Sequence, residues 1–133
     1  MAPRLLAAGA LLALAIAAPA QAKTTGARYV TAHAGAITCA GLTAAKGPGI
    51  TCASQIANGA TNPILTMKSK GTAKIGSPGS LTGFPAAKAV KLNTGDHWKW
   101  AGITCGVTSG ALTCRNAVGK SFRITALQFT VFN

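Results

Sequence analysis

The sequence predicts an all-β protein, a small sandwich or open barrel of short antiparallel hairpins held by two disulfides. Short runs rich in Ile, Val, Thr and aromatic residues alternate with Gly, Pro, Asn and Ser, which is the pattern of strands and turns. Beyond Ala22, no window of helical length repeats its apolar positions with the period of about 3.6. An even number of cysteines, Cys39, Cys52, Cys105 and Cys114, supplies thiols for two cross-links.

The segment 1–22 has the parts of a cleavable secretory signal. Arg4 precedes an uncharged apolar stretch, Leu5–Ala18, and Ala20-Gln21-Ala22 gives the small-x-small pattern that signal peptidase needs. The apolar stretch is shorter than the about 20 residues of a membrane-spanning helix. No later segment is long and apolar enough to span a bilayer. We therefore expect a cleaved signal helix at 1–22 and one exported domain at 23–133, either secreted or periplasmic.

Without the signal, the chain is poor in large apolar side chains and strongly basic. The scarcity of Ile, Leu, Val, Met, Phe, Trp and Tyr predicts a thin core of the kind that disulfides reinforce. Removal of the signal takes away only Arg4 among the Lys and Arg residues and leaves one acid, Asp96, so the net charge falls from +12 to +11. Such a charge draws a protein to anionic surfaces; the alternative is that it only maintains solubility.

Ten strands are expected, each a short apolar or β-branched run between turn residues. They are placed at Arg28–Thr31, Ala36–Gly41, Gly49–Ala53, Ile64–Lys68, Thr72–Ile75, Ala89–Leu92, His97–Thr108, Ala111–Arg115, Ser121–Thr125 and Leu127–Phe132. The Gly76–Pro85 stretch is rich in turn residues and is expected to be a surface loop.

An apolar-Thr-Cys triplet occurs four times, as two pairs in different parts of the chain. The triplets end at Cys39 and Cys52 in the first pair and at Cys105 and Cys114 in the second. We interpret them as two similar cysteine hairpins within one domain. An ancient duplication is an alternative, although the segments between the pairs do not match convincingly.

The second hairpin has a register that predicts a disulfide. With Ser109-Gly110 as a two-residue loop, Cys105 faces Cys114 as the fourth pair. This pair is not hydrogen-bonded, which places its Cα atoms about 4.5 Å apart, within the disulfide range.

The first hairpin has a longer loop that ends in Gly47-Pro48-Gly49, so its register is less fixed. A Cys39–Cys52 bond follows from the repeated triplet and by elimination. A zinc site would need closely spaced cysteine knuckles, whereas the cysteines of each pair here are spaced far more widely.

Catalytic residues are hard to assemble from this chain. Asp96 is the only carboxylate side chain, which excludes paired-carboxylate chemistry, and His33 and His97 are the only histidines. Asp96 and His97 are neighbours, which point to opposite faces of a strand, and Asn93–Asp96 is expected to be a turn. We predict no catalytic residue, no metal and no cofactor; the alternative is a secreted nuclease using His33, His97 and Lys side chains.

Two groups of residues are candidates for binding. Lys68, Lys70 and Lys74 have the same parity, so an extended strand would align them as a basic stripe for a phosphate or sulfate polymer; the alternative is a solvated sheet face. Trp98 and Trp100 also share a face. We expect both to pack in the core beside Cys105, with Lys99 projecting outward; the alternative is stacking on sugars or bases.

The C-terminal third resembles the end of a family of small exported bacterial domains of unknown function. The resemblance rests on the stretch Gly110–Asn116, followed by Gly119, Phe122 and a closing Phe132. It covers roughly Ala36–Cys52 and Trp98–Phe132 and leaves the middle unaligned. Lys120-Ser121 stands where the family has His-Gly. The resemblance implies secretion, paired cysteine hairpins and a β fold, and no known catalytic residue.

Our leading hypothesis is a monomeric, non-enzymatic exported module. It would bind anionic polymers of the cell envelope, or other polyanions, through a basic surface that includes Lys68, Lys70, Lys74 and Lys99. We expect no specific nucleic-acid partner. The alternatives are a structural or protein-interaction domain with incidental charge, and a secreted enzyme or toxin.

Overall fold

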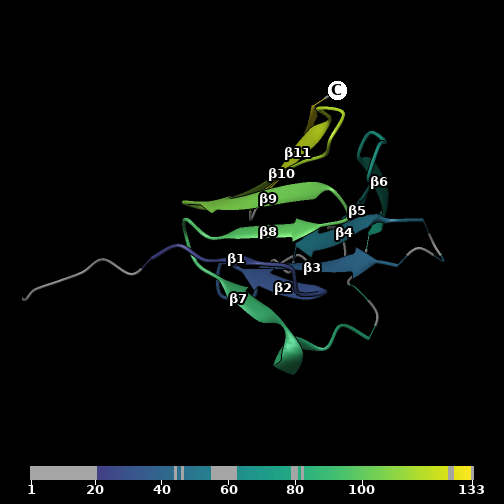
Figure 1. Ribbon diagram of the computed structural model, residues 1–133. Helices are drawn as coiled ribbons and strands as arrows, with labels where there is room; N and C mark the ends of the chain where they lie inside the picture. The colour runs from purple at the N-terminus through teal and green to yellow at the C-terminus, as the bar shows by residue number, and fades with distance from the viewer. Residues whose placement is uncertain are drawn as a thin grey trace, which may run out of the picture.

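The computed structural model describes residues 21–43, 45, 47–54, 63–78, 81, 83–125 and 128–132. Within these ranges the chain forms twelve strands in two six-stranded sheets, together with the short 3-10 helix η4 (Ala86–Lys88) (Figure 1). The protein is all-β, as the sequence predicts, and neither sheet closes into a barrel over the part described. The predicted signal helix lies outside the described residues, apart from Gln21 and Ala22.

Sheet A contains the second cysteine hairpin. Its strand order is β1-β8-β9-β10-β11-β12. The strands are β1 (Thr24–Thr25), β8 (His97–Trp100), β9 (Ile103–Thr108), β10 (Ala111–Arg115), β11 (Ser121–Thr125) and β12 (Phe129–Phe132). The pairs from β8 to β12 are antiparallel, whereas β1 pairs parallel with β8.

Sheet B contains the first cysteine hairpin. Its strand order is β6-β5-β4-β3-β2-β7. The strands are β2 (Tyr29–Ala32), β3 (Ile37–Leu42), β4 (Gly49–Ser54), β5 (Pro63–Lys68), β6 (Lys74–Pro78) and β7 (Val90–Leu92). The pairs from β2 to β6 are antiparallel, whereas β7 pairs parallel with β2.

The two sheets are built in the same way and exchange one strand each. Strands β1–β6 form a first repeat and strands β7–β12 a second repeat, each a short strand followed by a five-stranded antiparallel meander. The short strand of each repeat leaves its own meander and pairs with the first strand of the other: β1 with β8, and β7 with β2. The cysteine hairpins therefore belong to a structural repeat that extends well beyond them.

Side chains from both sheets form one core. The strands of sheet A alternate as expected: Ile103, Cys105 and Val107 are buried, and Thr104 and Thr108 are exposed. Each fully buried large apolar side chain contributes about 1.5–3 kcal/mol to folding. The largest of these side chains are Trp98, Phe122, Ile37, Ile50, Leu65, Met67, Ile103, Leu112 and Ile124.

Both predicted disulfides are present. Cys105 pairs with Cys114 in the register expected from the Ser109-Gly110 loop, with Cα atoms 4.0 Å apart. Cys39 pairs with Cys52, with Cα atoms 4.1 Å apart. Two disulfides are typical of a protein that resides in an oxidising compartment outside the cytoplasm.

Three strand predictions need correction. The expected strand His97–Thr108 is two strands, because Ala101 and Gly102 form a turn with φ of 51° and 77°. The expected loop from Gly76 begins inside β6, which continues to Pro78. The two-residue strand β1 is absent from the expected set, because a pair of threonines carries no local strand pattern.

None of the helices in the described ranges has the length and apolarity needed to cross a membrane.

Candidate functional site

Two turns from different repeats are held together by the side chain of Asn116. Its Nδ2 donates hydrogen bonds to the carbonyl oxygens of Lys68 (3.2 Å) and Gly71 (2.7 Å). Its Oδ1 accepts hydrogen bonds from the amides of Val118 (3.2 Å) and Lys120 (3.0 Å). Asn116 is 5% exposed, so these bonds form in a largely dry environment that strengthens them. The turn after β5 and the turn after β10 are thereby fixed side by side.

A third turn joins them through Ser69. Its hydroxyl donates a hydrogen bond of 2.7 Å to the carbonyl oxygen of Ala101, in the turn between β8 and β9. The backbone amide of Ser69 also donates to the carbonyl oxygen of Pro48 (3.0 Å), before β4. A shallow depression lies here, lined by Gly47, Pro48, Lys68, Ser69 and Lys70. Turns from four parts of the chain therefore meet at one end of the two sheets.

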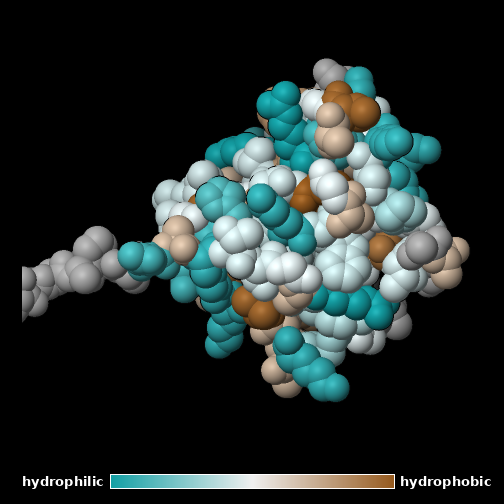
Figure 2. Space-filling model, in the orientation of Figure 1, coloured by the Kyte–Doolittle hydropathy of each residue, from teal (hydrophilic) through white to brown (hydrophobic). Residues whose placement is uncertain are grey.

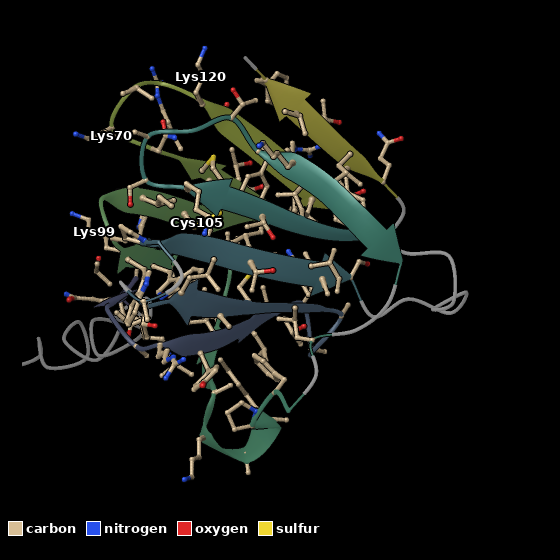
Figure 3. All side chains as sticks on the ribbon, turned by 90° about the vertical axis from the view of Figure 1, so that its right-hand side faces the viewer. Lys70, Lys99, Cys105 and Lys120 are labelled. Carbon is tan, nitrogen blue, oxygen red and sulfur yellow. A yellow bond between two sulfur atoms is a disulfide. The ribbon has the colours of Figure 1, made fainter. Side chains whose placement is uncertain are left out.

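Cationic side chains gather around these turns. We call them the basic end: Lys68, Lys70, Lys99, Arg115 and Lys120. Lys70 and Lys99 project from one side of the molecule and Lys120 from its adjoining upper edge, whereas Cys105 lies inside it (Figure 3). All five are exposed except Lys120, which is half-buried.

Part of the basic end is a row across sheet A. Lys99 pairs with Thr104, and Thr104 pairs with Arg115 on its other side. Directly paired residues point to the same face, so the two cations flank a threonine on the outer face, about 10 Å apart at the usual strand spacing. Arg123 lies on the same face in the next strand, β11.

The electrostatics of the basic end are shaped by the position of the chain's only acidic side chain. The carboxylate of Asp96 accepts hydrogen bonds from the amides of Asn93 (2.7 Å) and Lys23 (2.9 Å) and is 4% exposed. These bonds lower the pKa of Asp96 below its ordinary value and keep it ionised. The sequence has no other Asp or Glu, so the lysines and arginines of the basic end face no competing carboxylate side chain among their neighbours.

The predicted basic stripe does not form on one strand. Lys68 ends β5, Lys70 lies in the following turn, and Lys74 begins β6. The chain reverses at Gly71, whose amide donates to the carbonyl oxygen of Lys68 (3.2 Å). Lys74 instead pairs with Thr66 on the face of sheet B. Lys68, Lys70 and Lys99 belong to the basic end, whereas Lys74 lies on the next strand, β6.

The tryptophans pack as expected. Trp98 is fully buried, and its Nε1 donates to the carbonyl oxygen of Ala27 (2.7 Å). Trp100 is half-buried, and its Nε1 donates to the carbonyl oxygen of Leu42 (3.1 Å). Its ring lies against Gly41, where an added Cβ would come within 2.2 Å of it. Both rings therefore join sheet A to segments of the first repeat.

The two histidines are placed differently from each other. His33 lies in the turn between β2 and β3, and its Nε2 is 3.1 Å from the carbonyl oxygen of Ala111. His97 begins β8 and lies beside Gly106 on the outer face of sheet A. The described residues include no group of three His, Cys, Asp or Glu side chains that could hold a metal ion.

One further groove has no signature in the sequence. It lies on sheet B and is lined by Arg28, Tyr29, Ala40, Gly41, Leu42, Thr43, Thr51, Leu81, Gly83 and Phe84. Phe84 meets Tyr29 edge to face, with ring centroids 5.7 Å apart, and Arg28 lies 5.2 Å from the centre of the same tyrosine ring. The segment before η4 thus covers part of the outer face of sheet B.

The rest of the visible surface is mixed. Figure 2 shows hydrophobic residues as separate spots among hydrophilic ones on this face. Among the described residues, the exposed large hydrophobic side chains are Ile75, Val118 and Phe132.

Comparison with protein-family models, with curated proteins and with solved structures finds no match to this chain.

Proposed function

We propose that this protein is a non-enzymatic exported module that binds anionic polymers, such as those of the cell envelope, through the basic end. The observation that carries the proposal is the grouping of Lys68, Lys70, Lys99, Arg115 and Lys120 around turns that Asn116 and Ser69 hold together. Clustered cations bind a polyanion more tightly than scattered ones, because each contact releases a condensed counterion.

The nature of the surface favours a repeating anionic ligand over a small one. The cations lie on exposed turns and on an open sheet face, and the depression beside them is shallow. Small ligands are usually held in deep, mostly apolar pockets. A chain of phosphates or sulfates can instead follow an open row of charges such as Lys99 and Arg115.

Two matched triple variants test this function. One replaces Lys70, Lys99 and Lys120 with Gln; the other replaces Lys74, Lys88 and Lys91, which are exposed and lie outside the basic end. Both remove three charges, so general electrostatics change equally. Binding to a short DNA duplex of mixed sequence, to heparin and to purified envelope polymer is measured across a salt series.

We expect the basic-end variant to lose more affinity than the control. Its salt slope on DNA should fall by about 2–3, because each lost phosphate contact removes about 0.9. Equal losses of affinity in the two variants would show that there is no localised site and that binding depends only on net charge. Wild-type binding that does not weaken with salt, or no binding at low salt, would overturn the proposal and favour a protein-interaction domain with incidental charge.

A further inference from the structure

Among the residues that the structure describes, Asp96 is the one buried ionisable group that the proposed function does not use. It is the sole carboxylate side chain of the sequence, and it is 4% exposed. Two backbone amides hold it, those of Lys23 (2.9 Å to Oδ1) and Asn93 (2.7 Å to Oδ2). Lys23 Nζ lies 4.0 Å from Oδ2 on a side chain that is 48% exposed, so it is a solvated and distant ionic partner. A buried carboxylate is usually paired with a closer cation.

The backbone nitrogen that donates to Asp96 Oδ1 belongs to Lys23, the expected first residue of the cleaved chain. Lys23 directly follows Ala20-Gln21-Ala22, the predicted cleavage motif. Hydrolysis of the Ala22–Lys23 peptide bond by a signal peptidase adds one water: its hydroxyl goes to the carbonyl carbon of Ala22 and its hydrogen to the nitrogen of Lys23. The freed amine then takes a proton from solvent and becomes an ammonium. The atom 2.9 Å from Asp96 Oδ1 is thereby converted from a neutral amide donor into a cation.

We propose that Asp96 is the receptor for the new N-terminus, so that removal of the signal creates an ion pair between the Lys23 α-ammonium and Asp96. The premise is the predicted cleavage, and polyanion binding plays no part in it.

The surrounding contacts show what the ion pair would stabilise. The carbonyl oxygen of Lys23 accepts a hydrogen bond of 2.9 Å from the amide of His97, the first residue of β8. The next residue, Thr24, pairs with His97 in the parallel ladder of β1 and β8. The amide and carbonyl of Asp96 are themselves bonded to Asn93 and Val107. An ion pair here would hold the two-residue strand β1 on the sheet of the other repeat.

In the uncleaved chain, Lys23 can take the same position, but its bond to Asp96 is weaker. Ala22 lies beside Gly95, with room between them, so a residue preceding Lys23 causes no clash. The precursor therefore keeps the hydrogen bond but lacks the charge, and charge-assisted hydrogen bonds are roughly twice as strong as neutral ones. The charged groups that bear on Asp96 are the Lys23 side chain and His97, neither of which cleavage alters.

The first experiment compares two chains that differ only at this end. One begins at Lys23 and the other retains Gln21-Ala22; each is made with and without Asp96→Asn. At pH 7 we expect the chain that begins at Lys23 to melt roughly 5 °C higher, a shift typical of one strong interaction in a domain of about 100 residues. Asp96→Asn should abolish that difference. Equal melting temperatures, or a difference that survives Asp96→Asn, would overturn the proposal.

Lys23→Ala provides the matched control, because it removes the Nζ group and keeps the α-ammonium. We expect this variant to retain most of the difference between the two chain starts. A complete loss would show that the side chain, not the new terminus, is the partner of Asp96.

A second measurement does not need a folded Asp96→Asn variant. A carboxylate close to an ammonium raises the pKa of the ammonium. Each unit of pKa lowers the fraction of reactive, unprotonated amine tenfold. Acylation of the Lys23 α-amine, mapped by peptide mass, should be several-fold slower in the native chain than after denaturation. The α-amine of a chain starting at Gln21 should show a much smaller difference. Equal protection in both, or an exported protein whose first residue is not Lys23, would contradict the inference.

Discussion

The outer faces of the two sheets differ although the repeats share one pairing scheme. In the second repeat, Lys99, Thr104 and Arg115 form an exposed row across three strands. The same positions in the first repeat, counted from the disulfides, are Thr31, Thr38 and Ala53. Thr38 is 7% exposed and Ala53 is fully buried. The same three positions thus form a basic, exposed row in one repeat and, in the other, an uncharged row that is buried at Thr38 and Ala53.

The inner positions show a second difference. Val107 in the second repeat is matched by Gly41 in the first, because both lie two residues after the first cysteine of their hairpin. Gly41 leaves space for the Trp100 ring, which comes from the second repeat. The first repeat therefore provides the space at Gly41, and the second repeat provides both the Trp100 ring that fills it and the basic row of Lys99 and Arg115. The repeats differ in their side chains while the order of their strands is the same.

The disulfides test whether the two hairpins are equally important for stability. Replacing Cys39 and Cys52 with Ala, or Cys105 and Cys114 with Ala, should each cost about 2–4 kcal/mol, with the longer loop of the first pair placing it at or above the second. The separations are 13 and 9 residues. Urea unfolding of both variants measures this cost. A loss confined to one pair would show that the two hairpins do not contribute equally.

Asn116 tests whether the contact between turns matters for both structure and binding. The equivalent residue in the first repeat, two positions after the second cysteine of the hairpin, is the shorter Ser54. Asn116→Ser should cost about 1–3 kcal/mol for each buried group left unpaired, since a hydroxyl cannot reach both the Lys68 and the Gly71 carbonyl oxygens. Urea unfolding measures this loss.

Polyanion affinity should fall with the loss of Asn116 although no charge is removed. Asn93→Ala is the control, because Asn93 is exposed and its contact with Asp96 uses the backbone amide. Unchanged affinity in Asn116→Ser would show that the basic end does not depend on this link.

Gly41→Ala tests the packing of the Trp100 ring against Gly41. An added Cβ would lie 2.2 Å from the indole ring, so the ring must move, and overpacking of this kind costs about 1–3 kcal/mol. We expect a red shift of tryptophan emission as Trp100 becomes more exposed. Gly26→Ala, whose Cβ would meet only the Lys99 carbonyl oxygen at 3.7 Å, should change neither stability nor emission.

The smallest expected effect is the pH dependence from Asp96. Its pKa is lowered in the folded state from an ordinary 3.8, chiefly by the hydrogen bonds from Asn93 and Lys23. A lowered pKa means that Asp96 contributes stability above pH 3.8, which is lost as the pH falls through the folded value. The stability gap between wild type and Asp96→Asn should therefore narrow on acidification. A gap that stays constant from neutral pH to pH 2 would contradict this assignment.

Local sequence patterns predict the hairpins, and non-local contacts account for the places where the structure differs from the prediction. The Ser109-Gly110 loop determines the register through to Cys105 and Cys114, so this disulfide can be predicted from the chain alone. The turn at Ala101-Gly102 cannot be predicted in this way, because alanine rarely adopts a positive φ and is not a typical turn residue. The alternation of Trp98, Lys99 and Trp100 is instead typical of one strand that continues into β9.

The basic end could be predicted only in part, for the same reason. Parity predicts a stripe of Lys68, Lys70 and Lys74, whereas the turn at Gly71 separates Lys74 from the others. Asn116 links the backbone of Lys120 to the turn that follows β5, through hydrogen bonds to Lys68 and Gly71 that span 45 to 48 residues of sequence. No spacing rule in a single sequence reports a contact of that kind.

The exchange of short strands between the repeats has a consequence for the order of folding. Strand β1, at Thr24–Thr25, cannot pair until β8, which begins at His97, is available. Pairing over such distances slows folding because a long loop must close first. Because a protein is synthesised from its N-terminus, the first strand of this chain must wait for its last third before it can pair.

The first meander can assemble early, but its edge at β2 stays open until β7 arrives. The final event of folding would then be the closing of both edges, which leaves the chain vulnerable to proteases until its synthesis is almost complete.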